Sequence, residues 1–241
     1  MERGLPDGRA RRSKASELSA GVPLDPDSHE SAVRFIKENT ALIAPPLVPE
    51  IVLHLATESV PIWQKSEEEL GEMNVPPPFW AFAWAGGQAL ARYILDNPKM
   101  CSGQNVIDLG SGSGLSAIAA AKCGALGVLA ADIDRLAQVA IKLNADANGV
   151  AVTPTAQDLL ETEDLTERVV IIGDLFYERQ LADRVIAFIE RMKEGGAAVL
   201  IGDPQRSYFP RNRFELLAEY QVPVTRELED SEIKRSSVWR A

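Results

Sequence analysis

The sequence predicts an α/β fold with a doubly wound parallel sheet. Two observations carry this prediction. Between residues 105 and 201, short apolar segments that suit buried strands alternate with longer segments that show helical periodicity. Each of the apolar segments also contains, ends in or is closely followed by an aspartate, and the carboxyl ends of parallel strands are where such sheets bind ligands. We therefore expect helices on both faces of one sheet, with a site along one edge.

The alternating region supplies most of the expected elements. Strands are expected where consecutive residues are apolar, and helices where apolar residues recur every three or four positions, as Leu136, Val139, Ala140 and Leu143 do. The expected strands are residues 105–109, 128–132, 152–155, 169–173 and 197–201, and the expected helices are residues 114–123, 135–148 and 178–193.

The flanking regions have different patterns. Before the alternating region, periodicity and proline breaks predict helices at residues 28–39 and 62–71, a strand at residues 50–55, and a helix after Gly87 that ends at Pro98. Beyond it, we expect a short helix at residues 214–220 and then a closing hairpin. The two strand-like runs of that hairpin are residues 222–228 and 233–239.

Composition predicts the domain organisation. Residues 1–27 contain almost no periodic apolar residues, so we expect a disordered lead. Residues 28–100 form an N-terminal α+β extension that contains a segment rich in proline and tryptophan, and residues 101–241 form the core. With 241 residues, 46% of them hydrophobic, the chain can bury a core, and we expect residues 28–241 to form one structural domain.

Charge excludes some classes of partner. The formal net charge is −10, and all of it lies on residues 28–241 because the lead carries five basic and five acidic residues. An acidic body disfavours nucleic acid and anionic membrane surfaces, and no apolar stretch is long enough to span a bilayer. We therefore expect no nucleic-acid partner and no membrane association. A basic run at residues 9–14 resembles part of a targeting segment.

Few residues suit a metal site or nucleophilic hydrolysis. The chain has two histidines, His29 and His54, and two cysteines, Cys101 and Cys123. No metal-ligand spacing occurs among them, so we expect no metal, and His54 is expected on the surface of a strand, away from any hydrolytic site. Two isolated thiols indicate a reducing compartment, so we expect a cytoplasmic protein, or one of the mitochondrial matrix if its source is eukaryotic.

A glycine-rich turn carries the first chemical signal. The sequence Val-Ile-Asp-Leu-Gly-Ser-Gly-Ser-Gly spans residues 106–114, where a strand gives way to a helix. Gly110, Gly112 and Gly114 would let the backbone approach a nucleotide-like ligand closely. A dinucleotide fingerprint would place glycine where Leu115 stands, and Asp108 would repel a pyrophosphate. A cofactor with a cationic ammonium and sulfonium, S-adenosylmethionine, suits that carboxylate better.

Further carboxylates follow the neighbouring strands. Asp132 stands 22 residues after Gly110, the spacing of an acid that binds two ribose hydroxyls. Asp158 is placed to accept a hydrogen bond from an adenine amine, while Leu159 and the leucine after it cover the adenine face. Any one of these aspartates has an alternative interpretation as a loop or helix cap. The series continues with Asp174 and Asp203, and five in phase favour a binding site.

Together these features resemble a known superfamily, the seven-strand S-adenosylmethionine-dependent methyltransferases. Within it, three motifs are similar to the lysine methyltransferases that modify the beta subunit of electron transfer flavoprotein, and the similarity runs from about residue 35 to the C-terminus. The motifs are Pro-Pro-Pro-Phe-Trp-Ala-Phe-Ala-Trp-Ala-Gly-Gly-Gln-Ala-Leu-Ala at residues 76–91, Gly-Asp-Leu-Phe-Tyr at residues 173–177 and Ile-Gly-Asp-Pro at residues 201–204.

The resemblance implies a Rossmann-like seven-stranded sheet whose hairpin supplies the antiparallel strand, and transfer of a methyl group to a protein lysine, with the electron transfer flavoprotein beta subunit as the suspected substrate. Asp174 would orient the lysine amine, and Tyr177 and Trp80 would line its channel. Trp84 matches the family tryptophan that packs on the methionine end of the cofactor.

Two alternatives remain open at this stage. A small-molecule amine N-methyltransferase would share the fold and the cofactor motifs, because a fold does not choose a substrate. The second alternative is a non-catalytic module that keeps the cofactor pocket. The presence of Asp174 and Tyr177 beside an intact glycine loop argues against it. The target lysine, the number of methyl groups added and the oligomeric state do not follow from the sequence.

Overall fold

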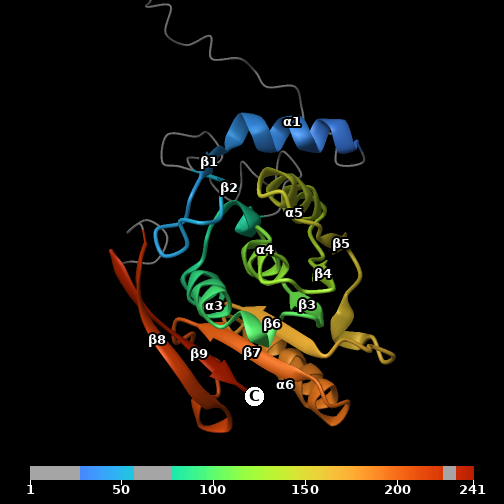
Figure 1. Ribbon diagram of the computed structural model, residues 1–241, viewed down its shortest axis with the longest axis vertical. Coiled ribbons are helices and arrows are strands. Elements are labelled where there is room, and N and C mark those ends of the chain that lie inside the picture. The colour runs from blue at the N-terminus through green and yellow to red at the C-terminus, as the bar shows by residue number, and fades with distance from the viewer. Residues whose placement is uncertain (1–27, 57–76, 225–231) are drawn as a thin grey trace, which may run out of the picture.

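The computed structural model describes residues 28–56, 77–224 and 232–241 (Figure 1). A seven-stranded sheet lies at its centre, with the strand order β5-β4-β3-β6-β7-β9-β8. The first five strands in that order run parallel, and β8 and β9 close the sheet as an antiparallel pair. The strands are β3 Asn105–Leu109, β4 Gly127–Ala131, β5 Thr153–Thr155, β6 Val169–Gly173, β7 Ala198–Asp203, β8 Glu215–Pro223 and β9 Ile233–Arg240.

Helices cover both faces of this sheet, as expected from the alternating apolar segments. Side chains of α3, α4 and α5 pack with one face of β3, β4, β6 and β7, and those of α6 pack with the other. The predicted strands and helices of the alternating region are confirmed to within two residues at each end. The helices are α3 Ala85–Asp96, α4 Leu115–Lys122, α5 Arg135–Ala147 and α6 Arg179–Glu194.

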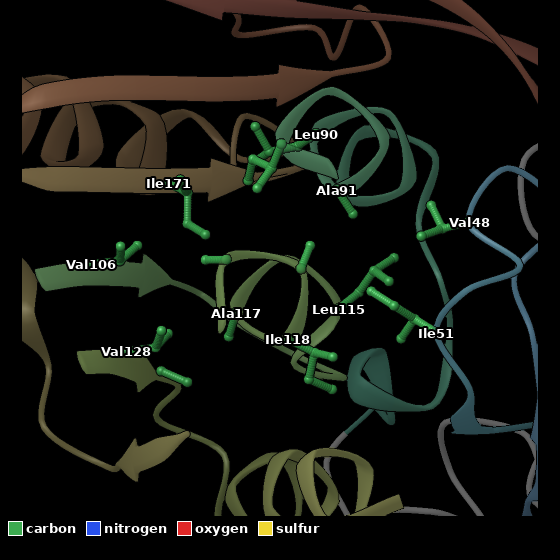
Figure 2. Close-up of a cluster of buried hydrophobic side chains, with 14 of the residues drawn as sticks. Val48, Ile51, Leu90, Ala91, Val106, Leu115, Ala117, Ile118, Val128 and Ile171 are labelled. Atoms are coloured by element: carbon green, nitrogen blue, oxygen red, sulfur yellow. The ribbon is translucent and has the colours of Figure 1, made fainter. Parts of the chain in front are cut away.

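The core between the sheet and α4 is built from small and β-branched residues. Figure 2 shows Val106, Val128 and Ile171 on the strands facing Ala117 and Ile118 of α4. Each of these side chains is 5% exposed or less. Small alanines on α4 let the helix approach the strands closely, which keeps the start of α4 tight against the end of β3.

The N-terminal region packs onto the same core. Helix α1 His29–Asn39 begins at Ser28, whose hydroxyl accepts a hydrogen bond from the Ser31 amide at 3.3 Å. It is followed by the antiparallel pair β1 Ala41–Ile43 and β2 Leu53–Leu55. Val48 and Ile51 of this region are fully buried and reach the cluster around α4 (Figure 2). The expected strand at residues 50–55 is therefore present but shorter.

One predicted element is wrong. Residues 214–220 were expected to be helical, but residues 215–223 form strand β8. The register of β8 against β9 shifts between Leu216 and Ala218, and this irregularity removes the regular alternation that identifies a strand in sequence. Pairing with β9 overrides a weak local preference. The expected arm at 222–228 lies mostly outside the described residues, as do the expected helix at 62–71 and the lead at 1–27.

His54 also differs from expectation. It is half-buried in β2, and its Nδ1 lies 3.0 Å from the Thr40 hydroxyl, so it is not a free surface residue. Burial lowers the pKa of its imidazole. Within residues 28–56, 77–224 and 232–241, no cluster of three or more histidine, cysteine, aspartate or glutamate side chains is arranged to hold a metal. The helices of the same segments are all too short or too polar to cross a bilayer.

Candidate active-site cleft

A cleft of about 650 Å³ opens at the carboxyl ends of the parallel strands. It lies where β3 has β4 on one side and β6 on the other, the point at which the strand order reverses. The structure brings eight of the ten predicted site residues to its wall, and Asp108 and Gly114 do not reach it. The eight are Trp84, Gly110, Gly112, Asp132, Asp158, Leu159, Asp174 and Tyr177.

The three glycines of the loop have different roles. All adopt positive φ, with values of 64° at Gly110, 53° at Gly112 and 82° at Gly114, a region that favours glycine. A Cβ on Gly112 would meet only the Trp80 Cα, at 3.8 Å, so this position faces open space. A Cβ on Gly110 would collide with the Leu175 side chain at 2.6 Å. Gly114 is the N-cap of α4 and turns the chain behind the cleft.

Asp108 lies beneath this loop. It is 2% exposed, and its Oδ2 accepts hydrogen bonds from the Ser111 hydroxyl at 2.6 Å and the Ala117 amide at 3.0 Å. Burial raises the pKa of its carboxyl to about 7, against the effect of these two donors. Asp108 therefore ties the glycine loop to the first turn of α4, and it also lines a small pocket that shares Trp84, Gly110 and Asp174 with the cleft.

Asp132 joins the end of β4 to the glycine loop. Its Oδ2 accepts a hydrogen bond from the Gly112 amide at 2.8 Å, and its Oδ1 accepts one from the Asp134 amide at 3.0 Å. Burial raises the pKa of this carboxyl. Each oxygen keeps a further lone pair for a ligand, because a carboxylate oxygen accepts about two hydrogen bonds.

Asp158 is the N-cap of the 3₁₀ turn Leu159–Glu161. Its Oδ1 accepts a hydrogen bond from the Leu160 amide at 3.0 Å, and its Oδ2 is paired with Arg184 of α6 at 2.6 Å. Leu159 is 2% exposed and forms the floor of this end of the cleft. The sequence analysis missed Arg184, which lies on a helix face with no local motif to single it out.

Asp174 is held in a strained conformation at the end of β6. Its φ is 58°, which is uncommon for any residue other than glycine, and its side chain is 9% exposed. Its Oδ2 accepts a hydrogen bond from the Gly87 amide in the first turn of α3, at 2.9 Å. Its Oδ1 accepts from Arg206 Nε at 3.1 Å and Nη2 at 2.7 Å. Strain of this kind persists where the surroundings hold it, and often marks a functional site.

Arg206 is a further cleft residue that was not predicted from the sequence. It follows the Gly-Asp-Pro motif by two residues and lies on the cleft wall, with its guanidinium 5.6 Å from the centre of the Trp84 ring. Asp203 Oδ1 accepts hydrogen bonds from the Gln205 amide at 2.7 Å and the Arg206 amide at 2.8 Å. The Gly-Asp-Pro motif therefore forms the turn that places Arg206 on the cleft wall. This role is visible only in the folded chain.

Two glycines let these segments meet. A Cβ on Gly86 would lie 2.5 Å from Asp174 Oδ2, and one on Gly202 would collide with the Gly86 carbonyl oxygen. Helix α3 consequently begins directly against the ends of β6 and β7. This contact explains why glycine follows the tryptophan-rich segment.

Aromatic side chains surround the mouth of the cleft. Phe79 and Tyr177 are 53% and 48% exposed, and their ring centres are 6.0 Å apart. The Trp84 indole donates a hydrogen bond to the Phe79 carbonyl at 2.8 Å. Trp80 is 1% exposed, and its indole nitrogen has no hydrogen-bond partner among the described residues. Trp80 therefore belongs to the core and to the cleft wall at once.

Comparison with known proteins identifies the family of this chain. Residues 88–202 match the ribosomal protein L11 methyltransferase (PrmA) family. Proteins named electron transfer flavoprotein beta subunit lysine methyltransferase are 38% identical in Danio rerio, over 88% of this chain and 84% of the relative, and 37% identical in Homo sapiens, over 91% and 84%. The crystal structure of Trm5b from Pyrococcus abyssi shares the fold, with a TM-score of 0.51 and 14% identity over 84% of this chain and 55% of that one. The expected superfamily fold is confirmed, and the chain belongs to the electron transfer flavoprotein beta subunit lysine methyltransferase family of enzymes.

Proposed function

We propose that this protein transfers a methyl group from S-adenosylmethionine to a lysine side chain of the electron transfer flavoprotein beta subunit. The observation that carries the proposal is the composition of the cleft. Asp132 and the glycine loop line it together with Asp174 and exposed aromatic rings. The names of the curated relatives support the choice of reaction and of substrate.

The residues of the cleft fit the cofactor. Gly112 leaves open space where another residue would place a Cβ, so an extended ligand can lie against the loop. Asp132, Asp158 and Asp174 bring carboxylate oxygens to the wall, and those of Asp132 have no cationic partner among the described residues, which suits hydrogen-bond donors of the cofactor such as ribose hydroxyls. When bound, the cofactor supplies a methyl group on positively charged sulfur.

Each predicted residue then has a role along that ligand. Asp132 would accept hydrogen bonds from the ribose hydroxyls, and Asp158 from the adenine amine, with Leu159 against the adenine face. Trp84 would pack on the methionine end, next to Asp174. Asp108 and Gly114 would act indirectly, by shaping the loop beneath the cofactor.

The remaining wall would receive the lysine. A neutral amine carries the lone pair that attacks the methyl group, so the site must bring it in desolvated and aligned. Phe79 and Tyr177 would flank the lysine stem at the mouth, and Asp174 would accept a hydrogen bond from the amine and so direct its lone pair. Much of the rate enhancement would come from this positioning.

A direct assay tests the proposal. The protein is incubated with S-adenosylmethionine labelled on its methyl group and with purified electron transfer flavoprotein of the same organism, and the beta subunit is analysed by mass spectrometry. We expect label on a lysine of that subunit, with competition by S-adenosylhomocysteine. Label on other proteins of an extract but not on this subunit would overturn the substrate, and label only on small molecules would favour an amine N-methyltransferase.

A further inference from the structure

Arg206 forms an ion pair with the carboxylate of Asp174, the group that would contact the substrate amine in the proposed mechanism. Two guanidinium nitrogens, Nε and Nη2, contact the same Asp174 oxygen, at 3.1 and 2.7 Å. Contacts of this charge-assisted kind are stronger than neutral hydrogen bonds and fix the orientation of both groups. The carboxylate is therefore paired with a cation before any substrate enters.

This pair is shielded from water. The Asp174 side chain is 9% exposed and the Arg206 side chain 21% exposed. Electrostatic interactions are stronger here than at an open surface, because little solvent screens them. The Arg206 guanidinium also lies 5.6 Å from the centre of the Trp84 ring, so its charge covers an aromatic face that would otherwise attract a cation.

These positions bear on the chemistry of the amine. A lysine in water is an ammonium ion, which has no lone pair and cannot attack a methyl group. An unpaired carboxylate beside an open aromatic face would bind that ion and hold it in the unreactive form. A carboxylate already paired with a guanidinium still accepts a hydrogen bond from a neutral amine, but it offers little net attraction to a cation.

We propose that Arg206 selects the neutral form of the substrate amine, by neutralising Asp174 and covering the Trp84 face. The inference deepens the proposed function and rests on it. Arg206 is thus a positioning and specificity-determining residue, while Asp174 is the group that contacts the amine. The same pairing would help release the product, because methyl transfer to a neutral amine leaves a methylated ammonium.

Other titratable groups lie near the Asp174–Arg206 pair, and their effects on the pH profile must be distinguished from the effect of the pair. Asp203 lies behind the turn that carries Arg206, with its carboxyl pKa raised to about 7 by burial. Asp108 lies at the glycine loop, Asp132 also lines the cleft, and Tyr177 is at the mouth beside Glu178. Titration of Asp203 would produce a change in the pH profile similar to the one expected from Arg206. A separate Asp203 variant is therefore needed to distinguish the two.

The test is the pH dependence of kcat for the flavoprotein subunit at saturating cofactor and protein substrate, which reports ionisations in the enzyme–substrate complex, measured from pH 6.5 to 10. In Arg206→Gln we expect the rise of kcat on the acidic side of the profile, its acidic limb, to move up by about one pH unit. The variant should then lose roughly tenfold in kcat at pH 7 but less than about threefold at pH 10. Arg206→Lys should keep most of the wild-type limb. The double variant Arg206→Gln with Asp174→Asn removes both charges and should restore the position of the limb, at lower turnover.

Several outcomes would overturn the inference. A uniform loss in Arg206→Gln at every pH would mean that Arg206 only supports the fold. A limb that moves in Asp203→Asn but not in Arg206→Gln would assign the titration to Asp203. A loss of more than about tenfold in S-adenosylhomocysteine affinity by calorimetry would make Arg206 a cofactor residue. Failure of the wild type to methylate the subunit would instead overturn the proposed function.

Discussion

The two walls of the cleft are built in different ways. The glycine wall, residues 110–114 with Asp132, joins the loop after β3 to the end of β4 and is held by backbone amide donors, as in the contact from Gly112 to Asp132 at 2.8 Å. The charge wall, Gly87 with Asp174 and Arg206, comes from three distant segments. A buried ion pair and the hydrogen bond from the Gly87 amide hold it together and maintain the strained backbone of Asp174.

This difference suits two tasks. A cofactor that is the same in every catalytic cycle can be bound by backbone donors in fixed positions, on a loop whose glycines have positive φ. A lysine amine must lose a proton before it reacts. The charges of a nearby ion pair shift the pKa of the amine and so control this deprotonation. We therefore expect damage to the glycine wall to affect cofactor binding, and damage to the charge wall to affect turnover.

Asp132→Ala should give the largest effect, on the glycine wall. It removes two expected charge-assisted hydrogen bonds to the ribose, each worth about 1.5–3 kcal/mol, so we expect S-adenosylhomocysteine affinity to fall by about 10² or more. Isothermal calorimetry measures this directly. Unchanged affinity would remove Asp132 from the cofactor site.

Asp174→Asn tests the charge wall. The amide keeps the shape but loses the charge that pairs with Arg206 and orients the amine, an effect realised mainly in the transition state. We expect turnover to fall by about 10² with cofactor affinity within a few fold. Steady-state kinetics at saturating cofactor and protein substrate measure both. Full turnover would make this carboxylate structural and pass the catalytic assignment to Tyr177 or Glu178.

Gly202→Ala tests how closely the charge wall is assembled. The new methyl group would collide with the Gly86 carbonyl oxygen, so α3 must move away from β7 and carry the Gly87 amide with it. Overpacking of this kind costs about 1–3 kcal/mol of unfolding free energy, which urea denaturation measures. Gly87→Ala is the matched control, because a Cβ there has nothing within 4 Å. Equal stability of the two variants would contradict the close contact.

Asp108→Asn tests the support beneath the glycine wall through pH. The pKa of Asp108 is raised to about 7 in the folded protein, above the value of about 3.9 for an unfolded chain. Between these values the unfolded state binds fewer protons, so stability falls as pH rises from about 4 to 7 and then levels off. We expect a smaller fall in the variant, measured by urea unfolding at pH 5 and 8. The fall due to Asp203 should remain.

Asp158→Ala should give the smallest effect. Asp158 is about two-fifths exposed and already paired with Arg184, so its hydrogen bond to adenine competes with water and with that arginine. We expect the KM for S-adenosylmethionine to rise a few fold with little change in turnover. A turnover loss as large as that of Asp174→Asn would erase the distinction between the walls.

The parallel half of the fold and the glycine wall could be predicted from the amino-acid sequence. Strands such as Val-Val-Ile-Ile-Gly at 169–173 are buried on both faces, so their apolar runs are visible without the structure. The loop at 110–114 and Asp132 are separated by one helix and one strand, α4 and β4, and this characteristic spacing carried the prediction. The position of Asp174 at a strand end followed from the same logic.

The charge wall and the antiparallel edge could not be predicted from the sequence, because both depend on contacts between distant segments. Arg206 meets Asp174 across 32 residues of sequence, and Gly87 meets it across 87. An isolated arginine after a turn has no pattern that identifies its partner. The strand at 215–223 likewise depends on pairing with β9, whose contact across an irregular register leaves no regular alternation in the sequence. Local periodicity reports which face of an element is buried, whereas contacts between distant segments depend on the packing that the whole chain adopts.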